Sequence, residues 1–397
     1  MRIGIDARFL THPQAGGFKT YSVNLLSALG EIDAENQYIV YVDRPLPEHV
    51  ARPSNANFVW RIVPGTQRLI GMPWREQVRL RWQISQDRLD LVHFLCNTAP
   101  VGLPNHYVIT LHDTIQVTAK RSWINSLAGF KQFAITEYSR QSILHSVRRA
   151  DCVITVSNSE RMEIGATLHI PLERIIVTHL APNPLFHPPT DEERQTARHY
   201  IEQQYGVSGR YVLGVGYEPR KNILLLIQAF SELAREFEQF CLIAVVAEDH
   251  QRRHYQEVVA QMGLIDRVRL IGAVPPDAMA LLYGSAEVFV FPSIRESFGL
   301  PPIEAMACGT PTIAMGKSSI PEVVQDGALL VDSVETRAWV DAIRLVLSND
   351  ELRVNLRSRG LYRATQLSWH RCAEETLSVY RSIIAHAPAP YSRTLPV

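Results

Sequence analysis

Short apolar runs alternate with helical stretches along the chain, and this rhythm occurs twice. In the first half the runs are 1–7, 38–42, 58–63, 91–94, 107–111 and 152–156, and in the second half they are 211–215, 242–247, 268–271, 288–291, 312–314 and 328–331. Apolar strands that alternate with helices are typical of a parallel sheet covered by helices on both faces. The sequence therefore predicts two α/β halves of similar length.

A proline-rich passage separates the two series. Residues 181–189 read A-P-N-P-L-F-H-P-P, and a polar, charged stretch with helical spacing follows at 191–205. Proline interrupts both helices and strands, and domain boundaries fall in segments of this kind. We therefore expect a domain boundary in this region, with one α/β half on each side and a cleft between them.

Composition narrows the classes of protein to which the chain can belong. The 397 residues include 40 Lys and Arg and 40 Asp and Glu, so the formal net charge is zero. A nucleic-acid binder needs a basic surplus to neutralise phosphates, so we expect no nucleic-acid partner. The longest apolar run, 240–247, is far shorter than the roughly 20 residues that span a bilayer. The N-terminal stretch 1–10 carries Asp6 and Arg8 among its apolar residues, unlike a signal peptide, and we expect a cytoplasmic protein.

The cysteines and histidines do not form the patterns of a metal site. The five cysteines lie far apart without a C-x-x-C pair, which favours reduced, mostly buried thiols. His250 and His254 are four positions apart, but the residues between them lack the glutamate of a zinc-protease helix. We expect no metal ion and no other cofactor.

The most informative stretch is P-S-I-R-E-S-F-G-L-P-P-I-E-A-M-A-C-G-T-P, residues 292–311. We expect a strand to end near Phe291, followed by a glycine-containing loop and a helix from about Pro302. Ligands of open α/β sheets bind at such loops, and the N–H groups at a helix start attract anions. Glu296 in the loop and Glu304 in the helix can accept hydrogen bonds from the hydroxyls of a polyol. A capped helix with two solvated glutamates fits the same residues.

A second loop of this type is G-V-G-Y-E-P-R-K-N, residues 214–222, between a strand and a helix. Pro219 stands where the dinucleotide-binding fingerprint has its third glycine, so a Rossmann dehydrogenase is disfavoured. Arg220 and Lys221 suit a diphosphate, because they combine a forked donor with a point charge. A solvated basic turn is the alternative.

Two further groups follow strands in the first half. Gly16 and Gly17 come after the first strand, and paired glycines let a backbone approach a ligand closely. His112 and Asp113 follow the run 107–111, and a histidine there can donate to a sugar hydroxyl or relay a proton near pH 7. Taken alone, these residues also fit a plain turn and a structural His–Asp pair.

These motifs resemble those of retaining glycosyltransferases of family 4, which have the GT-B fold. The family's E-x7-E motif is close to E-G-F-G-L-P-x-L-E-A-M-A-C-G-x-P, and residues 292–311 match it with Ser297 for Gly and Ile303 for Leu. Residues 214–222 are similar to its G-x-x-E-P-R-K-N segment and are one residue shorter. A bare E-x7-E pair would be weak, whereas this length of match is specific.

The resemblance implies roles for the second-half residues. Glu296 would act as a catalytic residue facing the transferred sugar, and Glu304 would hold the ribose of a nucleotide sugar. Arg220 and Lys221 would contact the donor's diphosphate. The backbone near Glu296 would also contribute to donor binding, at Phe298, Gly299 and Leu300.

The first half carries weaker matches to the same family. Residues 16–21, G-G-F-K-T-Y, resemble its G-G-(I/V)-G-x-Y loop, with Phe18 and Lys19 in place of Ile and Gly. This implies that Gly16 and Gly17 belong to a loop that closes over the donor. His112 and Asp113 resemble the family's H-D dipeptide, which places His112 as a catalytic residue near the reacting sugar and Asp113 on the acceptor side.

The resemblance also implies the architecture: two Rossmann-like domains with parallel sheets that face a cleft. We expect an acceptor-side domain at 1–185 and a donor-binding domain at 186–369. Residues 368–375, S-W-H-R-C-A-E-E, are similar to the family's final segment, which crosses back to the first domain. The first domain should therefore be completed by about 370–390.

The reaction implied is transfer of a hexosyl group from a nucleotide sugar to an acceptor hydroxyl with retention at the anomeric carbon. Family frequency alone favours mannose from GDP-mannose, and the resemblance implies a glycan or lipid-linked acceptor. The sequence has no D-x-D motif, so Arg220 and Lys221 would stabilise the leaving diphosphate in place of a metal. A nucleotide-sugar epimerase and an inactive sugar-nucleotide-binding subunit remain alternatives.

One local charge imbalance suggests a membrane contact. Residues 61–149 contain 12 Lys and Arg against 5 Asp and Glu. The basic residues form two groups among aromatic and apolar neighbours: Arg68, Arg75, Arg79 and Arg81 with Ile70, Met72, Pro73, Trp74 and Trp82, and Lys120, Arg121, Lys131, Arg140, Arg148 and Arg149 with Trp123, Leu127, Phe130 and Phe133. Such faces can lie on an anionic membrane surface. Buried aromatics beside solvated arginines are the alternative.

Overall fold

The computed structural model describes residues 1–12, 16–47, 50, 52–65, 71–118, 127–216 and 218–386, with only the backbone for 127–132. The chain divides into two compact units. Unit 1 comprises residues 1–180 together with the segment that begins at Trp369, and unit 2 comprises residues 181–368. The sequence placed the corresponding boundaries at 185 and 369.

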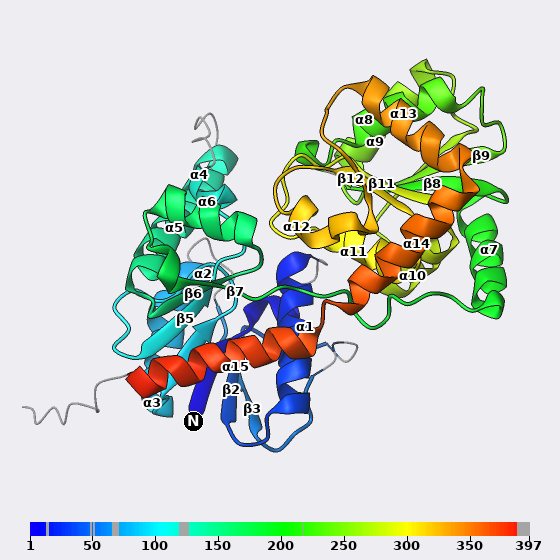
Figure 1. Ribbon diagram of the computed structural model, residues 1–397. Coiled ribbons are helices and arrows are strands. Elements are labelled where there is room, and N and C mark those ends of the chain that lie inside the picture. Colours follow the sequence, from blue (N-terminus) through cyan, green and yellow to red (C-terminus); the bar gives the residue numbers. More distant parts are fainter. Residues whose placement is uncertain are drawn as a thin grey trace, which may run out of the picture. The chain divides into compact units, whose positions relative to one another are not determined.

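Unit 1 is built on a parallel sheet, and its described part has seven strands in the order β3-β2-β1-β4-β5-β6-β7 (Figure 1). The strands are β1 (Arg2–Asp6), β2 (Gln37–Val42), β3 (Phe58–Ile62), β4 (Leu91–Phe94), β5 (His106–Thr110), β6 (Cys152–Thr155) and β7 (Ile175–Val177). At the centre, Ile3 of β1 lies opposite Tyr38 of β2 on one side and Leu91 of β4 on the other. Central strands such as β4 are buried throughout, which explains why they read as continuous apolar runs.

Helices flank the sheet of unit 1 (Figure 1). They are α1 (Gly17–Ile32), α2 (Gly71–Trp74), the π-helix η2 (Arg75–Leu80), α3 (Arg81–Asp87), α4 (Ile115–Thr118), α5 (Leu127–Arg149), α6 (Asn158–Leu168) and α15 (Trp369–His386), with 3₁₀ turns η1 (Arg8–Thr11) and η3 (Leu172–Arg174). The last helix, α15, packs against α1 and buries Cys372, Leu377 and Tyr380. This confirms the expected C-terminal helix that returns to the first domain.

Unit 2 repeats the design with a parallel sheet whose strand order is β10-β9-β8-β11-β12-β13. The strands are β8 (Arg210–Val215), β9 (Phe240–Val245), β10 (Val268–Ile271), β11 (Val288–Phe291), β12 (Thr312–Met315) and β13 (Leu329–Val331). The surrounding helices are α7 (Asp191–Tyr205), α8 (Ile223–Leu233), α9 (Asp249–Gln261), α10 (Pro276–Ser285), α11 (Leu300–Ala307), α12 (Ile320–Val324), α13 (Thr336–Ser348) and α14 (Asp350–Thr365), with 3₁₀ turns η4 (Pro219–Lys221) and η5 (Gln325–Gly327). The polar helix α7 begins at a capping box between Thr190 and Glu193, which satisfies its first N–H groups.

The two sheets confirm the expected α/β fold class, and every predicted strand is present. The strand β7 was missed, since it has only three residues and lies at the edge of its sheet. The helical segment from Gly71 to Asp87 is irregular, because it contains the six-residue π-helix η2. This wider turn carries Arg75 and Glu76 into the interior.

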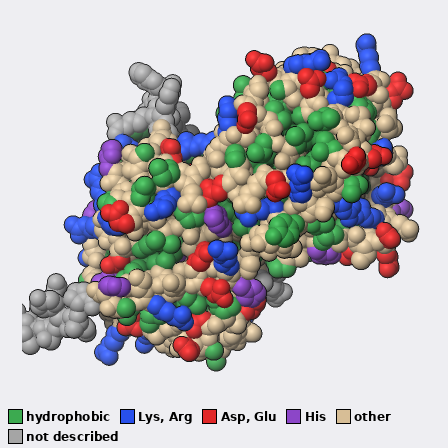
Figure 2. All heavy atoms as spheres, viewed as in Figure 1, with side chains coloured by type: hydrophobic (Ala, Val, Ile, Leu, Met, Phe, Trp, Pro, Cys, Tyr) green, Lys and Arg blue, Asp and Glu red, His purple; other side chains and the backbone are tan. Residues whose placement is uncertain are grey.

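The surface and the thiols match a neutral, reduced protein. On the face drawn in Figure 2, basic and acidic side chains are interspersed. The cysteines are free thiols, and all but the half-buried Cys241 are buried, as expected. Within the described ranges, none of the helices has the length and apolar character needed to cross a bilayer.

Candidate functional site

The loop after β8 brings two cations to the carboxyl edge of the sheet of unit 2. Arg220 and Lys221 lie in η4, and Asn222, with a left-handed φ of 56°, directly precedes α8. Gly216 has a φ of +150°, and a Cβ there would lie 2.4 Å from the Cβ of Lys221. Only glycine therefore fits beside the lysine stem.

Glu296 is the centre of a charged cluster in this unit. Its Oε1 lies 2.6 Å from Nζ of Lys221 and 3.3 Å from Nη1 of Arg220, and it accepts a hydrogen bond from the Ser293 hydroxyl. The lysine ammonium also lies 5.0 Å from the centroid of the Phe291 ring, a cation–π distance. The structure thus brings together the three charged residues that the sequence had found in two separate loops.

Arg220 is held by more partners than Lys221. Its Nη2 lies 2.5 Å from the carboxylate of Glu218, and its Nη1 donates to the carbonyl oxygen of Arg295 at 2.6 Å. The Arg220 side chain is 29% exposed and the Lys221 side chain 16% exposed. Both cations are therefore paired within the protein yet remain accessible from solvent.

The backbone after Glu296 is held by two serines from the loop that follows β12. Ser318 Oγ accepts from the N–H of Glu296 at 3.3 Å and donates to its carbonyl oxygen at 2.6 Å. Ser319 Oγ lies 2.9 Å from the carbonyl oxygens of both Glu296 and Phe298. Sequence reasoning missed both serines, although their place after the carboxyl end of a strand next to β11 is a usable signal.

Helix α11 begins at Leu300, two residues before the expected start. Gly299 precedes it with a φ of +98°, and a Cβ there would lie 2.4 Å from Cδ1 of Ile320, so this position requires glycine. Proline has no N–H at positions 301 and 302. The donors left at this helix start are therefore the N–H groups of Gly299 and Leu300.

Glu304 lies one turn into α11, and its side chain is half-buried. Burial raises the pKa of Glu304 to about 7, although the Tyr283 hydroxyl and the charge of Lys221 both oppose this shift. The Tyr283 hydroxyl, from α10, lies 3.5 Å from its Oε2. Without ligand, this carboxyl group is therefore partly protonated at neutral pH. Sequence reasoning did not find Tyr283.

In unit 1, His112 follows β5 and is packed between two aromatic rings of α1. The centroid of its ring lies 4.7 Å from that of Phe18 and 4.8 Å from that of Tyr21, both edge to face. Burial lowers the pKa of His112 to about 4, so the imidazole is neutral at physiological pH. Its Nε2 lies 3.1 Å from the carbonyl oxygen of Leu95.

These contacts correct the expectation that His112 donates to a sugar or relays a proton near pH 7. A carbonyl oxygen can only accept, so Nε2 of His112 carries the single proton of the neutral ring. The remaining nitrogen, Nδ1, can therefore only accept a hydrogen bond. The lowered pKa also keeps the ring from taking up a proton at neutral pH.

The loop after β4 supports His112. Asn97, with a left-handed φ of 57°, accepts from the His112 N–H through Oδ1 at 2.9 Å. Nη2 of Arg8 donates to the carbonyl oxygen of Cys96 at 3.0 Å. Arg8 is paired with Glu76 at 2.5 Å, and Glu76 in turn accepts from the Thr98 hydroxyl at 2.5 Å. These residues were not assigned from the sequence, and only the position of Asn97 after a strand gives a signal for them.

A second buried ion pair corrects part of the membrane hypothesis. Arg75 is fully buried and lies 2.7 Å from Asp6, whose carboxylate is also buried. Arg75 therefore belongs to the interior of unit 1 and not to the basic surface group in which the sequence placed it.

Gly16, Gly17 and Asp113 lie in the same unit as His112. Gly16 is extended and Gly17 begins α1, and a Cβ on either would meet no atom within 4 Å. The fold of unit 1 therefore does not itself require these glycines. Asp113 Oδ1 accepts from the N–H of Ile115 at 2.9 Å, at the start of α4.

An exposed apolar stripe runs along α2, η2 and α3. Trp74 is 42% exposed and Trp82 is 62% exposed, and Met72 and Val78 are exposed beside them. The side chains of Arg79 and Arg81 are exposed on the same segment. Arg68, Ile70, Lys120, Arg121 and Trp123 lie outside the described residues, as do the side chains of Leu127, Phe130 and Lys131. Of the second basic group, Phe133 and Arg140 are half-buried, and Arg148 and Arg149 are exposed.

Two family models match the chain. Residues 15–181 match the model described as Glycosyltransferase Family 4, and residues 210–362 match Glycosyl transferases group 1. The chain belongs to the glycosyltransferases of this family. Each of the two units carries one of the matched segments.

Among related sequences, the O-antigen chain mannosyltransferase B of Escherichia coli is 33% identical over 247 residues. The match covers 62% of this chain and 64% of that protein, so the chain spans less than two thirds of this relative's length.

Solved structures show the same GT-B fold. Sucrose-phosphate synthase from Thermosynechococcus elongatus has a TM-score of 0.74 at 22% identity, covering 97% of this chain and 100% of that one. The HepE protein of Anabaena, solved in complex with UDP-glucose, has a TM-score of 0.71 at 17% identity, covering 96% of this chain and 100% of that one. These comparisons do not favour the epimerase or the inactive-subunit alternative.

Proposed function

We propose that this protein transfers a hexosyl group from a nucleotide sugar to a hydroxyl of a glycan or lipid-linked acceptor, with retention at the anomeric carbon. The observation that carries the proposal is the cluster of Arg220, Lys221 and Glu296 at the carboxyl edge of the unit 2 sheet. The 33% identity to an O-antigen chain mannosyltransferase supports mannose as the sugar, GDP-mannose as the donor and polysaccharide synthesis as the setting.

The donor's diphosphate would bind to Arg220 and Lys221. In the free protein their charges are balanced by Glu296 and Glu218. A diphosphate would offer both cations stronger acceptors, and the N–H groups of Gly299 and Leu300 would add to the clamp. Glu296 would then be released to accept hydrogen bonds from the sugar hydroxyls.

Glu304 would hold the ribose of the donor. As a carboxylate it can accept hydrogen bonds from two neighbouring hydroxyls, which is the geometry that a ribose offers. Because burial raises the pKa of Glu304 to about 7, donor binding would favour its ionised form and expel a proton.

The chemistry follows from the charges. The bond between the anomeric carbon and the diphosphate oxygen breaks, and its electron pair leaves with the diphosphate. Arg220 and Lys221 would stabilise this negative charge, and Glu296 would stabilise the positive charge on the sugar. The acceptor oxygen bonds to the carbon on the face that the diphosphate leaves, and the acceptor's proton passes to the leaving phosphate oxygen. No metal ion takes part in these steps.

Unit 1 would contribute the acceptor side. Gly16 and Gly17 would let the backbone approach the donor, and His112 would accept a hydrogen bond from the reacting sugar through Nδ1. Asp113 would contact the acceptor. These roles rest on the family resemblance and on the placement of all four residues in one unit.

A screen of nucleotide sugars tests the donor assignment. GDP-mannose should raise the melting temperature more than UDP-glucose or ADP-glucose, since a ligand at about 100 times its Kd adds about 2.7 kcal/mol of stability. Transfer of labelled mannose to a mannose-terminated acceptor, with the anomer determined by NMR, tests the reaction. Donor turnover that does not depend on an acceptor would contradict transfer and favour epimerisation.

The exposed stripe on α2, η2 and α3 supports peripheral contact of the region 61–149 with an anionic membrane surface at the cytoplasmic face. Trp74 and Trp82 would enter the interface while Arg79 and Arg81 pair with lipid phosphates, each charge adding about 1 kcal/mol. The protein should co-sediment with phosphatidylglycerol vesicles at low salt but not at high salt. The W74S/W82S variant should show a smaller bound fraction. No binding at low salt would refute the contact and favour a soluble acceptor.

A further inference from the structure

Asn97 carries a buried amide without a partner beside His112. The residue is 2% exposed, and Nδ2 has no hydrogen-bond partner among the described residues. Its left-handed backbone is one that asparagine adopts more readily than most residues. A buried N–H left unpaired costs about as much as a lost hydrogen bond, so this donor needs an acceptor when the protein is at work.

The orientation of the Asn97 amide is fixed by its neighbour. The N–H of His112 donates to the side chain of Asn97 at 2.9 Å, so the atom that faces it must be the oxygen. The amide nitrogen therefore points to the other side. The loop cannot easily turn to satisfy it, because Arg8 holds the carbonyl oxygen of Cys96 and His112 holds that of Leu95.

Asn97 and His112, which are joined by this hydrogen bond, offer complementary groups. The amide nitrogen of Asn97 can only donate, while Nδ1 of His112 can only accept, because Nε2 carries the proton of the neutral ring. A phosphate or carboxylate would satisfy the first group only, and an ammonium the second only. A hydroxyl group satisfies both, since it accepts and donates at once.

We propose that Asn97 binds a sugar hydroxyl of the substrate, donating from Nδ2 to the hydroxyl oxygen while the hydroxyl proton is donated to Nδ1 of His112. This inference rests on the proposed glycosyltransferase function and deepens it. The hydroxyl belongs either to the transferred sugar or to the acceptor, and the same chemistry serves both.

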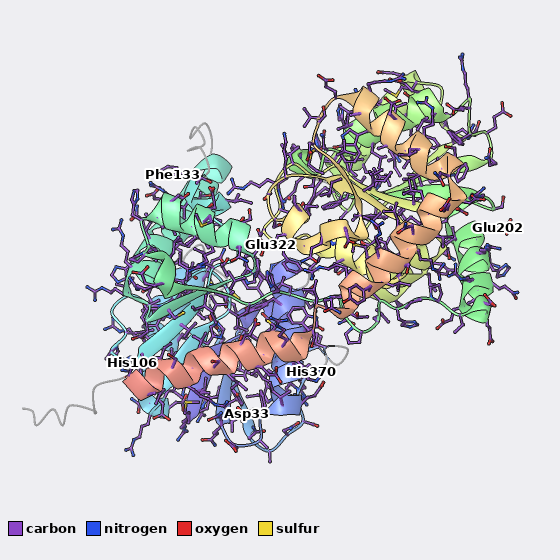
Figure 3. The ribbon with its side chains drawn as sticks, in the orientation of Figure 1. Asp33, His106, Phe133, Glu202, Glu322 and His370 are labelled. Atoms are coloured by element: carbon purple, nitrogen blue, oxygen red, sulfur yellow. The ribbon has the colours of Figure 1, made fainter. Side chains whose placement is uncertain are left out.

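Two variants test the contact without removing the backbone conformation. N97G keeps a left-handed backbone and removes the amide, and N97D keeps the oxygen that faces His112 but replaces the donor with an acceptor. N105A is the matched control. It removes an amide that donates to the carbonyl oxygen of Leu89 at 3.2 Å, at the amino end of β5 next to His106, which Figure 3 labels.

Affinities are measured by calorimetry for the nucleotide sugar that binds tightest among GDP-mannose, UDP-glucose and ADP-glucose, and for its nucleoside diphosphate. If Asn97 binds the transferred sugar, N97G and N97D should lower the affinity for the nucleotide sugar about tenfold and leave the affinity for the nucleoside diphosphate unchanged. If the acceptor is held, both affinities should stay constant while KM for an octyl α-mannoside acceptor rises about tenfold. N105A should change none of these values.

Deoxy sugars separate a direct contact from a structural role. For the monodeoxy analogue that lacks the bound hydroxyl, the wild-type protein should bind about tenfold more weakly than for the parent sugar. N97G should bind this analogue and the parent sugar equally well. The proposal would be overturned if N97G lost the same affinity for all analogues, or if its affinities and KM stayed within about twofold of wild type. The amide of Asn97 would then be a partner of a buried water. Absence of binding of any nucleotide sugar to the wild-type protein would instead contradict the proposed function.

Discussion

The two units place charge in opposite ways around their candidate sites. In unit 2, the buried Glu296 pairs with Lys221 and Arg220, whose side chains are partly exposed, so a charged ligand can reach these cations and replace their partner. In unit 1, the arginines near His112 are locked in buried pairs, and the histidine itself is neutral between two aromatic rings. Unit 2 is thus suited to exchange ionic partners with a diphosphate, whereas unit 1 is suited to hold an uncharged group in one orientation.

The largest effect should come from breaking the buried pair of unit 1. E76Q removes the carboxylate nearest to the buried Arg8 and, among the described residues, leaves it only that of Asp6, at 3.7 Å. Removing one partner of a buried pair costs about 3–5 kcal/mol. Urea unfolding followed by tryptophan fluorescence should show this loss in the free energy of unfolding. The signal reports mainly on unit 1, because the sequence of unit 2 contains only one tryptophan, Trp339.

The matched control for this prediction is E218Q in unit 2. It removes a more exposed partner of Arg220 and should cost no more than about 1 kcal/mol. Equal losses in the two variants would erase the contrast between locked and exchangeable charges.

The next effect should be on the reaction. E296Q removes the charge that balances Lys221 and that would face the sugar, while a glutamine keeps the shape of the side chain. Transfer should fall by about 10²–10³. The loss of stability should be smaller than in E76Q, because the two cations that E296Q leaves behind are partly exposed to water. The assignment is wrong if the purified variant retains more than about a tenth of the activity, a loss too small for a group of this kind.

This contrast also explains what the sequence could predict. The residues of unit 2 were found because their chemistry is local: each stands in a contiguous motif after a strand, and the fold only had to bring two such loops together. Asn97, Glu76 and Arg8 carry no motif, and their relation exists only because β1, β4 and β5 are neighbours in the sheet. Likewise, Arg75 was placed on the surface because the sequence gives no sign of the π-helix or of its pairing with Asp6.

The third prediction concerns pH, where the two units should again differ. Burial raises the pKa of Glu304 to about 7 and lowers that of His112 to about 4. Of these two groups, therefore, Glu304 titrates near neutral pH and His112 does not. Donor binding needs the carboxylate, so affinity should rise with pH up to about 7, by at most about tenfold per pH unit. A nucleotide sugar is the right probe, because its doubly esterified diphosphate does not titrate in this range.

The sign for stability is the reverse of that for binding. A carboxyl group whose pKa is raised in the folded protein stabilises the fold at low pH, and this contribution is lost as pH rises to about 7. E304Q should therefore reduce the pH dependence of both the donor affinity and the free energy of unfolding. A pH dependence of donor affinity that persists in E304Q would assign the titration to another group.

The smallest effect should come from removing metal ions. Arg220 and Lys221 supply the positive charge that a diphosphate leaving group needs, and they are positioned by Glu296 and by the backbone before any ligand arrives. The transfer rate in excess EDTA should therefore stay within about twofold of that in Mg²⁺, since preorganised cations already stabilise the leaving charge. K221M is the matched variant, and its activity should be low to the same extent in both conditions. Complete loss of wild-type activity in EDTA, restored by Mg²⁺ or Mn²⁺, would show that the exchangeable charges of unit 2 are insufficient on their own.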